Sequence, residues 1–186
     1  SNSAFGEVWW FYCSKASNQV DKYVIWNYQE NLWYTGSLDR STWIDSGTYP
    51  LPYATKYDGT NSTLFIHEQG KNDDGSTLTS FIESGDFDIG DGDDILFVNK
   101  LIPDFKNQVG NVNISLKSRY FPTDTQTTKG PFFYSTSSSK VNVRTRGRQI
   151  AVRLESNGYN NINNDALDED WRLGTLRFEV QPDGKR

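Results

Sequence analysis

Turn-forming residues divide this sequence into apolar runs of strand length, and this division constrains the fold more than any other feature. Runs such as EVWWFYCS (residues 7–14), KYVIWNYQ (22–29) and DILFVNKLIPDF (94–105) are bounded by Gly, Asn, Asp, Ser and Lys. Aromatic residues make up 15% of the chain and Met is absent, while Thr, Ser, Asn, Asp and Gly are plentiful. This composition favours strands and turns over helices. The sequence therefore predicts an all-β protein.

The first 69 residues are predicted to form β-hairpins. In KYVIWNYQENLWYTG, residues 22–36, two strands flank a turn formed by Gln29, Glu30 and Asn31. Both faces of the first of these strands carry bulky side chains, as in a sheet stacked between neighbours. A rhythm of strand, turn and strand ending in Trp is typical of the outer strands of β-propeller blades. Residues 1–69 are therefore predicted to be propeller-like, with too few units to close a propeller.

A polar segment, GKNDDGS at residues 70–76, is predicted to link this region to a second domain over residues 77–186. Six or seven strands follow it at spacings suited to an antiparallel β-sandwich. Val112, Ile114 and Leu116 alternate with polar residues, which indicates one buried and one wet face. The apolar positions change from odd to even numbers around Gly147, where we expect a bulge or tight turn. The Asn-rich segment 157–170 is predicted to be a surface loop.

Charge and cysteine content limit the functions to consider. A net charge of -5 does not describe a protein that holds nucleic acid tightly through phosphate contacts. The single cysteine, Cys13, lies in an apolar run and is predicted to be buried in the core. No apolar run reaches the roughly 20 residues of a membrane helix, so a soluble protein is expected. The absence of Met, even at position 1, suggests a piece of a longer product.

Few residues offer catalytic or metal chemistry. His67 is the only histidine, so a Ser-His-acid or Cys-His site would have to include it, yet Cys13 lies in the other hairpin with no helix N-terminus or base signalled nearby. A catalytic role for His67 is therefore not expected. Glu83 and Asp88 could form a glycosidase pair if the fold brought them close. The acidic loop at residues 83–94 supplies oxygen ligands for a hard cation but departs from the EF-hand spacing. Its candidate metal ligands are Asp86, Asp88, Asp91 and Asp93. We expect these acidic residues to form turns, and we expect the protein to have no cofactor and no catalytic residues.

Two further groups of residues are candidates for contacts with partners. Basic residues share one face of a predicted strand: Lys140, Arg144, Arg146 and Arg148. They are expected either to meet an acidic neighbouring subunit or DNA, or to form a solvated strand face balanced by the many carboxylates. Large aromatic residues lie in strand-forming runs and are expected in sheet cores or subunit interfaces: Trp9, Trp26, Trp33, Trp43 and Phe105. Exposed tryptophans would instead suit a surface that stacks sugars.

Several strings in the second half resemble the tail-tube proteins of short-tailed bacteriophages. They are SFIESGDFDIGDGDDILFVNKLIPDF (80–105), TTKGPF (127–132), VRTRGRQIAVRLES (143–156) and WRLGTLRFEVQPDGKR (171–186). The family is the nozzle, or tail tubular protein B, class, also described as packaged-DNA stabilisation proteins. The hairpin at residues 21–36 is similar to the propeller-like body of that family, and the resemblance extends over residues 7–186.

This resemblance implies a mechanical role in the virion. Several copies would form a ring beneath the portal and adaptor, retain packaged DNA and conduct it during ejection. The lumen would guide DNA without tight or sequence-specific binding, because strong phosphate contacts would slow ejection. Arg144, Arg146 and Arg148 would then meet an acidic neighbouring subunit. Two alternatives remain open: a carbohydrate-binding or carbohydrate-cleaving β-domain, and a DNA-binding module that uses the basic strand.

Overall fold

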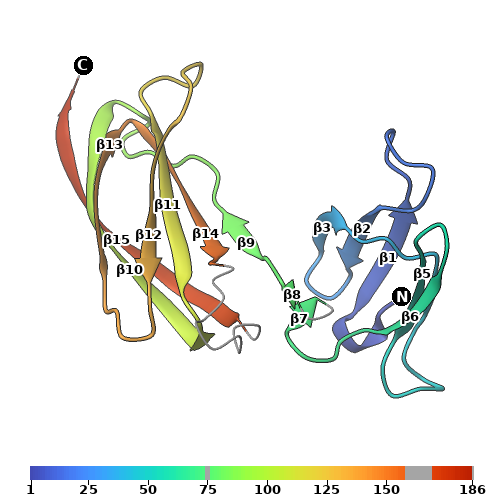
Figure 1. Ribbon diagram of the computed structural model, residues 1–186. Helices are drawn as coiled ribbons and strands as arrows, with labels where there is room; N and C mark the ends of the chain where they lie inside the picture. The colour runs from blue at the N-terminus through green and yellow to red at the C-terminus, as the bar shows by residue number, and fades with distance from the viewer. Residues whose placement is uncertain (74–75, 158–168, 186) are drawn as a thin grey trace. The chain divides into compact units, whose positions relative to one another are not determined.

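The computed structural model describes residues 1–73, 76–157 and 169–185 of the chain. Their secondary structure consists of β-strands and one three-residue 3-10 helix, η1 (Ser3–Phe5). The expectation of an all-β protein is confirmed, and the strands pair in antiparallel sheets. These described residues form neither a propeller nor a closed sheet. The chain divides into two compact units, Ser1–Gly70 and Lys71–Arg186 (Figure 1).

The first unit contains two three-stranded meanders. The first meander has the order β1-β2-β3, with β1 (Glu7–Tyr12), β2 (Lys22–Asn27) and β3 (Leu32–Ser37). The second has the order β4-β5-β6, with β4 (Thr42–Ile44), β5 (Tyr53–Tyr57) and β6 (Ser62–Ile66). The hairpin predicted over residues 22–36 corresponds to β2 and β3, which pair along their whole length.

The side chain of Asn27 shapes the turn of this hairpin. Its Oδ1 accepts hydrogen bonds from the backbone N–H of Gln29 at 3.1 Å and of Glu30 at 2.9 Å. Asn31 completes the turn with φ 54°, in the left-handed region that asparagine tolerates better than most residues. The predicted turn at Gln29, Glu30 and Asn31 is confirmed.

The two meanders pack against each other through one face of each sheet. Trp9 of β1 stacks on Trp43 of β4, with ring centroids 5.3 Å apart and planes 20° apart. Trp43 also lies 4.7 Å from the ring of His67. Ile25 of β2 and Ala54 of β5 are buried. Because side chains alternate along a strand, the residues next to these point to the opposite, outer face of each meander.

Cys13 is exposed, so the prediction that it lies in the core is wrong. That prediction treated the apolar run as one strand, but β1 ends at Tyr12. Asp21 closes the loop that follows, because its carboxylate accepts hydrogen bonds from the Ser14 N–H at 2.7 Å and the Ser14 hydroxyl at 2.6 Å. The hydroxyl and then the N–H of Ser14 lower the pKa of Asp21. The chain thus leaves the sheet before Cys13, and the thiol faces solvent.

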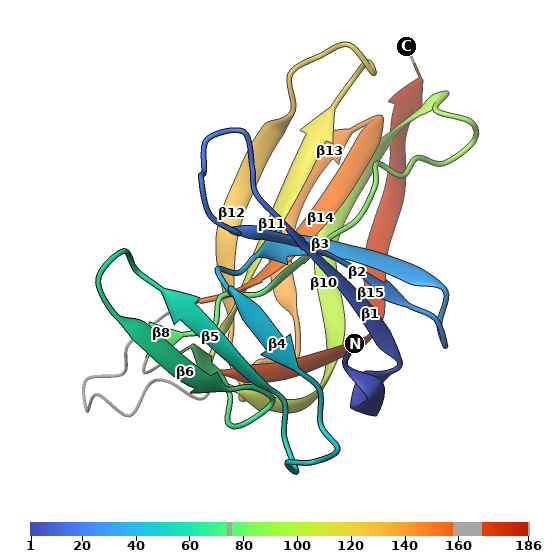
Figure 2. The ribbon, with the colours of Figure 1, turned by 90° about the vertical axis from the view of Figure 1, so that its right-hand side faces the viewer.

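The second unit contains two larger sheets that face each other (Figures 1 and 2). One has the order β13-β10-β15 and the other β12-β11-β14-β9. The strands of these sheets are β9 (Phe81–Glu83), β10 (Asp94–Val109), β11 (Val112–Arg119), β12 (Thr127–Tyr134), β13 (Val141–Gly147), β14 (Gln149–Ser156) and β15 (Asp170–Lys185).

The hydrophobic core of the second unit lies between these two sheets. Val112, Ile114 and Leu116 of β11 are fully buried, and the polar residues between them are partly exposed, so the predicted alternation is confirmed. They pack with buried side chains of β10, β13 and β14, namely Leu96, Val98, Leu101, Val141, Val143, Ile150, Val152 and Leu154. Each such side chain contributes about 1.5–3 kcal/mol through its removal from water.

Arg148 lies where the chain passes from one sheet to the other. Strand β13 ends at Gly147 in the first sheet, and β14 begins in the second sheet just after Arg148. The buried side chains change from odd to even numbers across this point, from Val143 to Ile150. Glycine suits the crossing because a Cβ on Gly147 would lie 3.0 Å from the Cβ of Ser118. The predicted change of parity therefore reflects a change of sheet.

The boundary between the two units falls at residue 70, where the predicted linker of residues 70–76 begins. Within that segment β7 (Asn72–Asp73) pairs with β8 (Ser76–Thr77), and residues 74–75 lie outside the described residues. Most of the predicted surface loop at 157–170 also lies outside them, at residues 158–168. In the described part of the chain, no helix is long and apolar enough to cross a membrane.

Candidate interaction surface

Three of the five aromatic residues expected in sheet cores or subunit interfaces pack inside their own unit. Trp9 and Trp43 lie between the two meanders, where the indole Nε1 of Trp43 also donates to the Ser1 carbonyl at 2.9 Å. Phe105 packs against the core of the second unit, with its ring 5.3 Å from that of Tyr134. These three side chains therefore support the fold of each unit and leave Trp26 and Trp33 as interface candidates.

The outer face of the first meander carries three tryptophans whose rings lie against one another. Trp33 of β3 is 62% exposed. Its ring centroid lies 5.9 Å from that of Trp10 and 6.0 Å from that of Trp26, with planes 21° and 20° apart. Trp26 is directly opposite Trp33 in the register, whereas Trp10 is opposite Val24 of the central strand. The sequence placed both Trp9 and Trp10 in a sheet core or subunit interface, and only the register shows which of these two adjacent tryptophans faces outward.

We call this outer surface of the first meander the aromatic face. Its outward side chains are Val8, Trp10, Tyr12, Lys22, Val24, Trp26, Trp33, Thr35 and Ser37. Beyond Trp33, the side chains of Trp10 and Tyr12 are also exposed. Lys22 is the only charged residue in this set, and its Nζ donates to the Ser37 hydroxyl at 2.6 Å.

The outer surface of the second meander is also apolar, and we call it the aliphatic face. Its outward side chains are Thr42, Ile44, Tyr53, Thr55, Tyr57, Ser62, Leu64 and Ile66. Leu64 is 63% exposed, and Ile44 and Ile66 are exposed as well. The hydroxyls of Thr42 and Thr55 bond to each other at 2.7 Å. This set of side chains contains no charged residue.

These two faces are unusual for sheets in contact with water. The solvated face of an antiparallel sheet normally carries polar and charged side chains, yet these two faces together carry one charge, that of Lys22. They point away from each other, because the inner faces of the two meanders pack together. Contiguous exposed apolar surface makes both faces candidates for interaction with a partner. The first unit therefore presents two apolar surfaces, one on each side.

Part of the predicted basic stripe shares one face in the second unit: Arg144 and Arg146 lie on the exposed face of β13, whereas Lys140 precedes this strand and Arg148 follows it. Its members are Lys140, Arg144, Arg146 and Arg148. Arg146 forms an ion pair with Asp183 of β15 at 2.5 Å. Arg148 lies at the crossing between the sheets, where it donates to the Gly92 carbonyl at 2.9 Å. Arg144 has φ 56°, so the strand is irregular at that point. Two of the four side chains are thus engaged by groups of the same unit.

In the acidic loop at residues 83–94, the carboxylate of Asp86 contacts other side chains, and the backbone of Asp91 and Asp93 forms a turn. Its candidate metal ligands are Asp86, Asp88, Asp91 and Asp93. Asp86 pairs with the guanidinium of Arg119 and accepts a hydrogen bond from Gln126 at 2.8 Å. Asp93 donates its N–H to the Gly90 carbonyl at 3.1 Å, and Asp91 has φ 55°, as in a tight turn. Within the described ranges, no three His, Cys, Asp or Glu side chains are grouped so that they could hold a metal ion.

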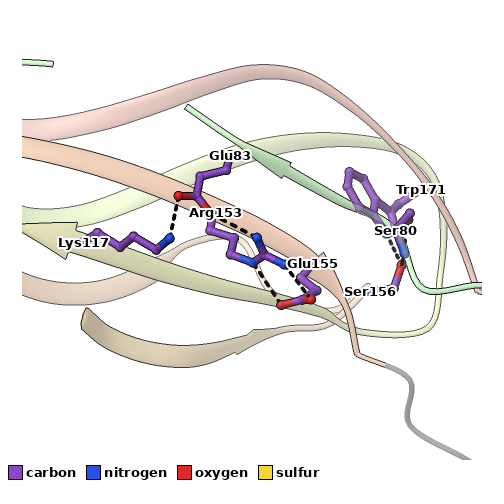
Figure 3. A network of polar contacts seen from close by, with 7 residues as sticks. All are labelled: Ser80, Glu83, Lys117, Arg153, Glu155, Ser156 and Trp171. Carbon is purple, nitrogen blue, oxygen red and sulfur yellow. Dashed lines mark hydrogen bonds and ion pairs between the residues drawn. The ribbon is translucent and has the colours of Figure 1, made fainter. Parts of the chain in front are cut away.

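Glu83 lies in a network of charged side chains on the outer face of the second sheet (Figure 3). Its carboxylate pairs with Lys117 of β11 at 2.5 Å and with Arg153 of β14 at 3.0 Å. Arg153 also pairs with Glu155 at 2.9 Å and lies over the ring of Phe81 at 3.8 Å. The hydrogen bond from Lys117, and then that from Arg153, lowers the pKa of Glu83. The network thus fastens the short edge strand β9 to its neighbour β14.

A second set of polar contacts lies where the chain enters β9 (Figure 3). The hydroxyls of Ser80 and Ser156 bond to each other at 2.8 Å. The indole Nε1 of Trp171 in β15 donates to the Ser156 hydroxyl at 3.2 Å. The Ser156 N–H also donates to the Ser80 carbonyl at 2.8 Å. Strands from both sheets therefore meet at the start of β9.

Glu83 and His67, which the sequence offered as candidates for catalysis, both contact side chains of their own unit. A glycosidase acid needs a raised pKa, whereas the cations around Glu83 lower its pKa. His67 accepts a hydrogen bond from the Nε of the buried Arg40 at 3.0 Å and packs on Trp43. Both residues therefore serve contacts within their own unit.

No protein-family model matches the sequence, and no curated protein matches it. Clues to function therefore come from the side chains on the surfaces of the two units. Of the surfaces described above, the aromatic and aliphatic faces expose the most apolar side chains with the fewest charges. Removal of such surface from water is the main driving force for protein association. The aromatic and aliphatic faces are therefore the candidate interaction surfaces of the first unit.

Proposed function

We propose that this chain is a non-enzymatic structural subunit of the tail tube, or nozzle, of a short-tailed bacteriophage. In this role a ring of subunits joins the portal or adaptor to other tail proteins, retains packaged DNA and conducts it during ejection. The resemblance of the strings at residues 80–105, 127–132, 143–156 and 171–186 supports the assignment. An all-β chain with two binding surfaces in one unit is compatible with a ring-forming subunit.

The observation that carries the proposal is the pair of apolar outer faces on the first unit, which together carry one charged side chain, that of Lys22. Blades of a β-propeller stack face to face around an axis, so each blade has apolar side chains on both sides. The two meanders stack in this way through Trp9 and Trp43 and leave an apolar face on each side. We therefore regard them as two propeller-like blades, followed by an antiparallel β-sandwich in the second unit.

The charge distribution supports passage of DNA without tight binding. The net charge is -5, and Arg146 is neutralised by Asp183. Phosphate contacts would have to come from cations that lack such partners, and each contact makes DNA affinity more dependent on salt. We expect the chain to bind duplex DNA weakly, with no sequence preference, and we expect Arg146→Glu to leave that weak binding nearly unchanged. Tight binding that falls steeply with salt and is lost in Arg146→Glu would favour a DNA-binding module instead.

Light scattering of the purified chain across protein concentration tests the tail-tube assignment directly. We expect a defined closed oligomer whose mass stays constant above a threshold concentration, as a ring requires. A longer version of the protein that includes flanking sequence should form the same kind of ring. A strict monomer for both proteins would refute the assignment.

The three stacked tryptophans of the aromatic face favour one second candidate, a carbohydrate-binding β-domain. Exposed indole rings offer apolar faces for sugar rings, and Trp33 is the most exposed of the three. Trp43→Ala is unsuited to testing this candidate because Trp43 packs between the meanders. Trp33→Ala is the informative variant on a glycan array. Glycan binding by the monomer that is lost in Trp33→Ala would favour this candidate over the tail tube.

A further inference from the structure

We propose that copies of this chain join through the two outer faces of the first unit, with the aromatic face of one copy packed on the aliphatic face of the next. This inference rests on the proposed ring and names the surfaces that build it. Trp10, Trp26 and Trp33 would lie at the centre of the contact on one side, and Ile44, Leu64 and Ile66 on the other.

The contact inside the unit shows what kind of partner covers such a face. The inner face of the first meander already packs on a three-stranded antiparallel meander, through the stacked rings of Trp9 and Trp43. Facing sheets lie about 10 Å apart, with interdigitated side chains from both. The aliphatic face of another copy offers the same kind of surface, a short antiparallel sheet without charged side chains. Packing of the next copy would therefore repeat the kind of sheet-on-sheet contact that already joins the two meanders.

Charge also favours this partner. A partner surface rich in charged side chains would lose hydration on contact with these apolar faces, and burial of unpaired charge is costly. The only charge on either face is Lys22, whose Nζ bonds to the Ser37 hydroxyl at the end of β3. Lys22 therefore lies at the rim of the aromatic face, where it can stay hydrated. The centre of each face is free of charged residues.

The arrangement of the two faces determines the symmetry. A two-fold dimer through the aromatic faces would leave both aliphatic faces exposed to water, and a dimer through the aliphatic faces would leave the aromatic faces exposed. Like-face pairing would need two different contacts in alternation to cover both surfaces, whereas a single head-to-tail contact between unlike faces covers both surfaces of every copy. Head-to-tail contacts generate a closed ring when the rotation between copies permits closure. This geometry agrees with the ring of the proposed function.

The test uses the full chain with one face blocked at a time. Trp33→Asp places a carboxylate on the aromatic face, and Leu64→Asp places one on the aliphatic face. Both positions are more than 60% exposed, at 62% and 63%, so both variants should fold. Phe133→Asp is the matched control, because Phe133 is 65% exposed but lies in the second unit. Each blocking variant should weaken self-association by about 30-fold or more, as loss of an interface hot spot does, and the control should assemble as the unmodified chain does.

Mixing the two blocked variants identifies the pairing. Trp33→Asp keeps its aliphatic face and Leu64→Asp keeps its aromatic face, so an equimolar mixture should form a species with the mass of two chains and nothing larger. Sedimentation velocity measures this mass, and circular dichroism checks that each variant is folded.

Each other outcome has a defined meaning. Assembly of both variants like the unmodified chain would overturn the proposed contact and leave the ring function standing. Loss of assembly in only one variant, with no rescue on mixing, would show pairing between like faces and would also overturn it. A monomeric unmodified chain at every concentration would overturn the proposed contact, and the ring function would be refuted as well only if the longer protein were also monomeric.

Discussion

The charged network around Glu83 permits a quantitative prediction about β9. Replacement Glu83→Gln removes a carboxylate that is paired with Lys117 and Arg153. Ion pairs near a surface contribute about 0.2–1 kcal/mol each. Because glutamine can still accept one hydrogen bond, we expect a net loss of about 1 kcal/mol in the free energy of opening β9. That loss corresponds to about a fivefold increase in the population of the open state.

Amide hydrogen exchange at Ser84 measures this opening. The Ser84 N–H follows β9 directly and donates to the Val152 carbonyl of β14 at 2.9 Å. At pH 7 we expect the Ser84 amide to exchange about five times faster in Glu83→Gln, after correction for the intrinsic rate. The amides of the buried β11 should keep their protection, because the variant does not alter the core between the sheets.

The pH dependence of this difference has a definite sign. The pKa of Glu83 is lower in the folded protein than its ordinary value, so the unfolded chain binds more protons as the pH falls. The stabilisation is complete above the ordinary pKa of glutamate, about 4.3. It is lost as the pH falls through the lowered folded pKa. The difference between Glu83→Gln and the unmodified protein should therefore shrink towards zero at strongly acidic pH.

A matched variant shows whether the effect is specific to this network. Asp183→Asn removes the carboxylate that pairs with Arg146, which is more exposed and lies in the other sheet. It should leave exchange at Ser84 unchanged. Two results would refute the reasoning: unchanged Ser84 exchange in Glu83→Gln at pH 7, or a difference of the same size at acidic pH, which would point to packing and not to charge.

Three further predictions concern individual positions. Gly130→Ala should destabilise the second unit by about 2 kcal/mol or more in calorimetry, because Gly130 has φ 121° and a Cβ there would lie 2.8 Å from the carbonyl oxygen of Ile114; an unchanged melting temperature would contradict this. Trp43→Ala should lower the free energy of unfolding of the first unit by about 3 kcal/mol, because packing on Trp9 is lost. The fluorescence of the remaining tryptophans should then show unfolding at a lower urea concentration, and an unchanged midpoint would contradict this. Cys13 should react rapidly and stoichiometrically with a thiol reagent in the folded protein, and slow reaction only on unfolding would show that it is covered.

The alternating patterns of the second unit made its core predictable. Polar residues separate Val112, Ile114 and Leu116, so only one pairing face can be buried, and the structure buries that face. The change of the apolar positions from odd to even numbers near Gly147 also indicated correctly that the buried face of the chain changes there. Its cause was not predictable, because a bulge and a crossing between sheets both absorb one residue.

The binding faces of the first unit were harder to predict, since bulky residues occupy both faces of its strands. In EVWWFY, Trp9 turns inward to Trp43 and Trp10 turns outward to Trp33, and either choice satisfies the local pattern. The register between strands decides between them, and register is a property of the folded sheet. Cys13 was wrongly assigned to the core for a related reason, because composition did not show where β1 ends.

The position of β9 determines how the second unit would respond to mechanical tension. The chain from the first unit reaches the second unit's core sheets through β9, so a pull along that connection loads β9 before any other strand of those sheets. Phe81 and Ile82 of this strand are exposed, and three register pairs join it to β14. We therefore expect β9 to detach under force while the core of β10 to β15 stays closed. Detachment of β9 would lengthen the chain between the two units while the other strands of the second unit stay folded.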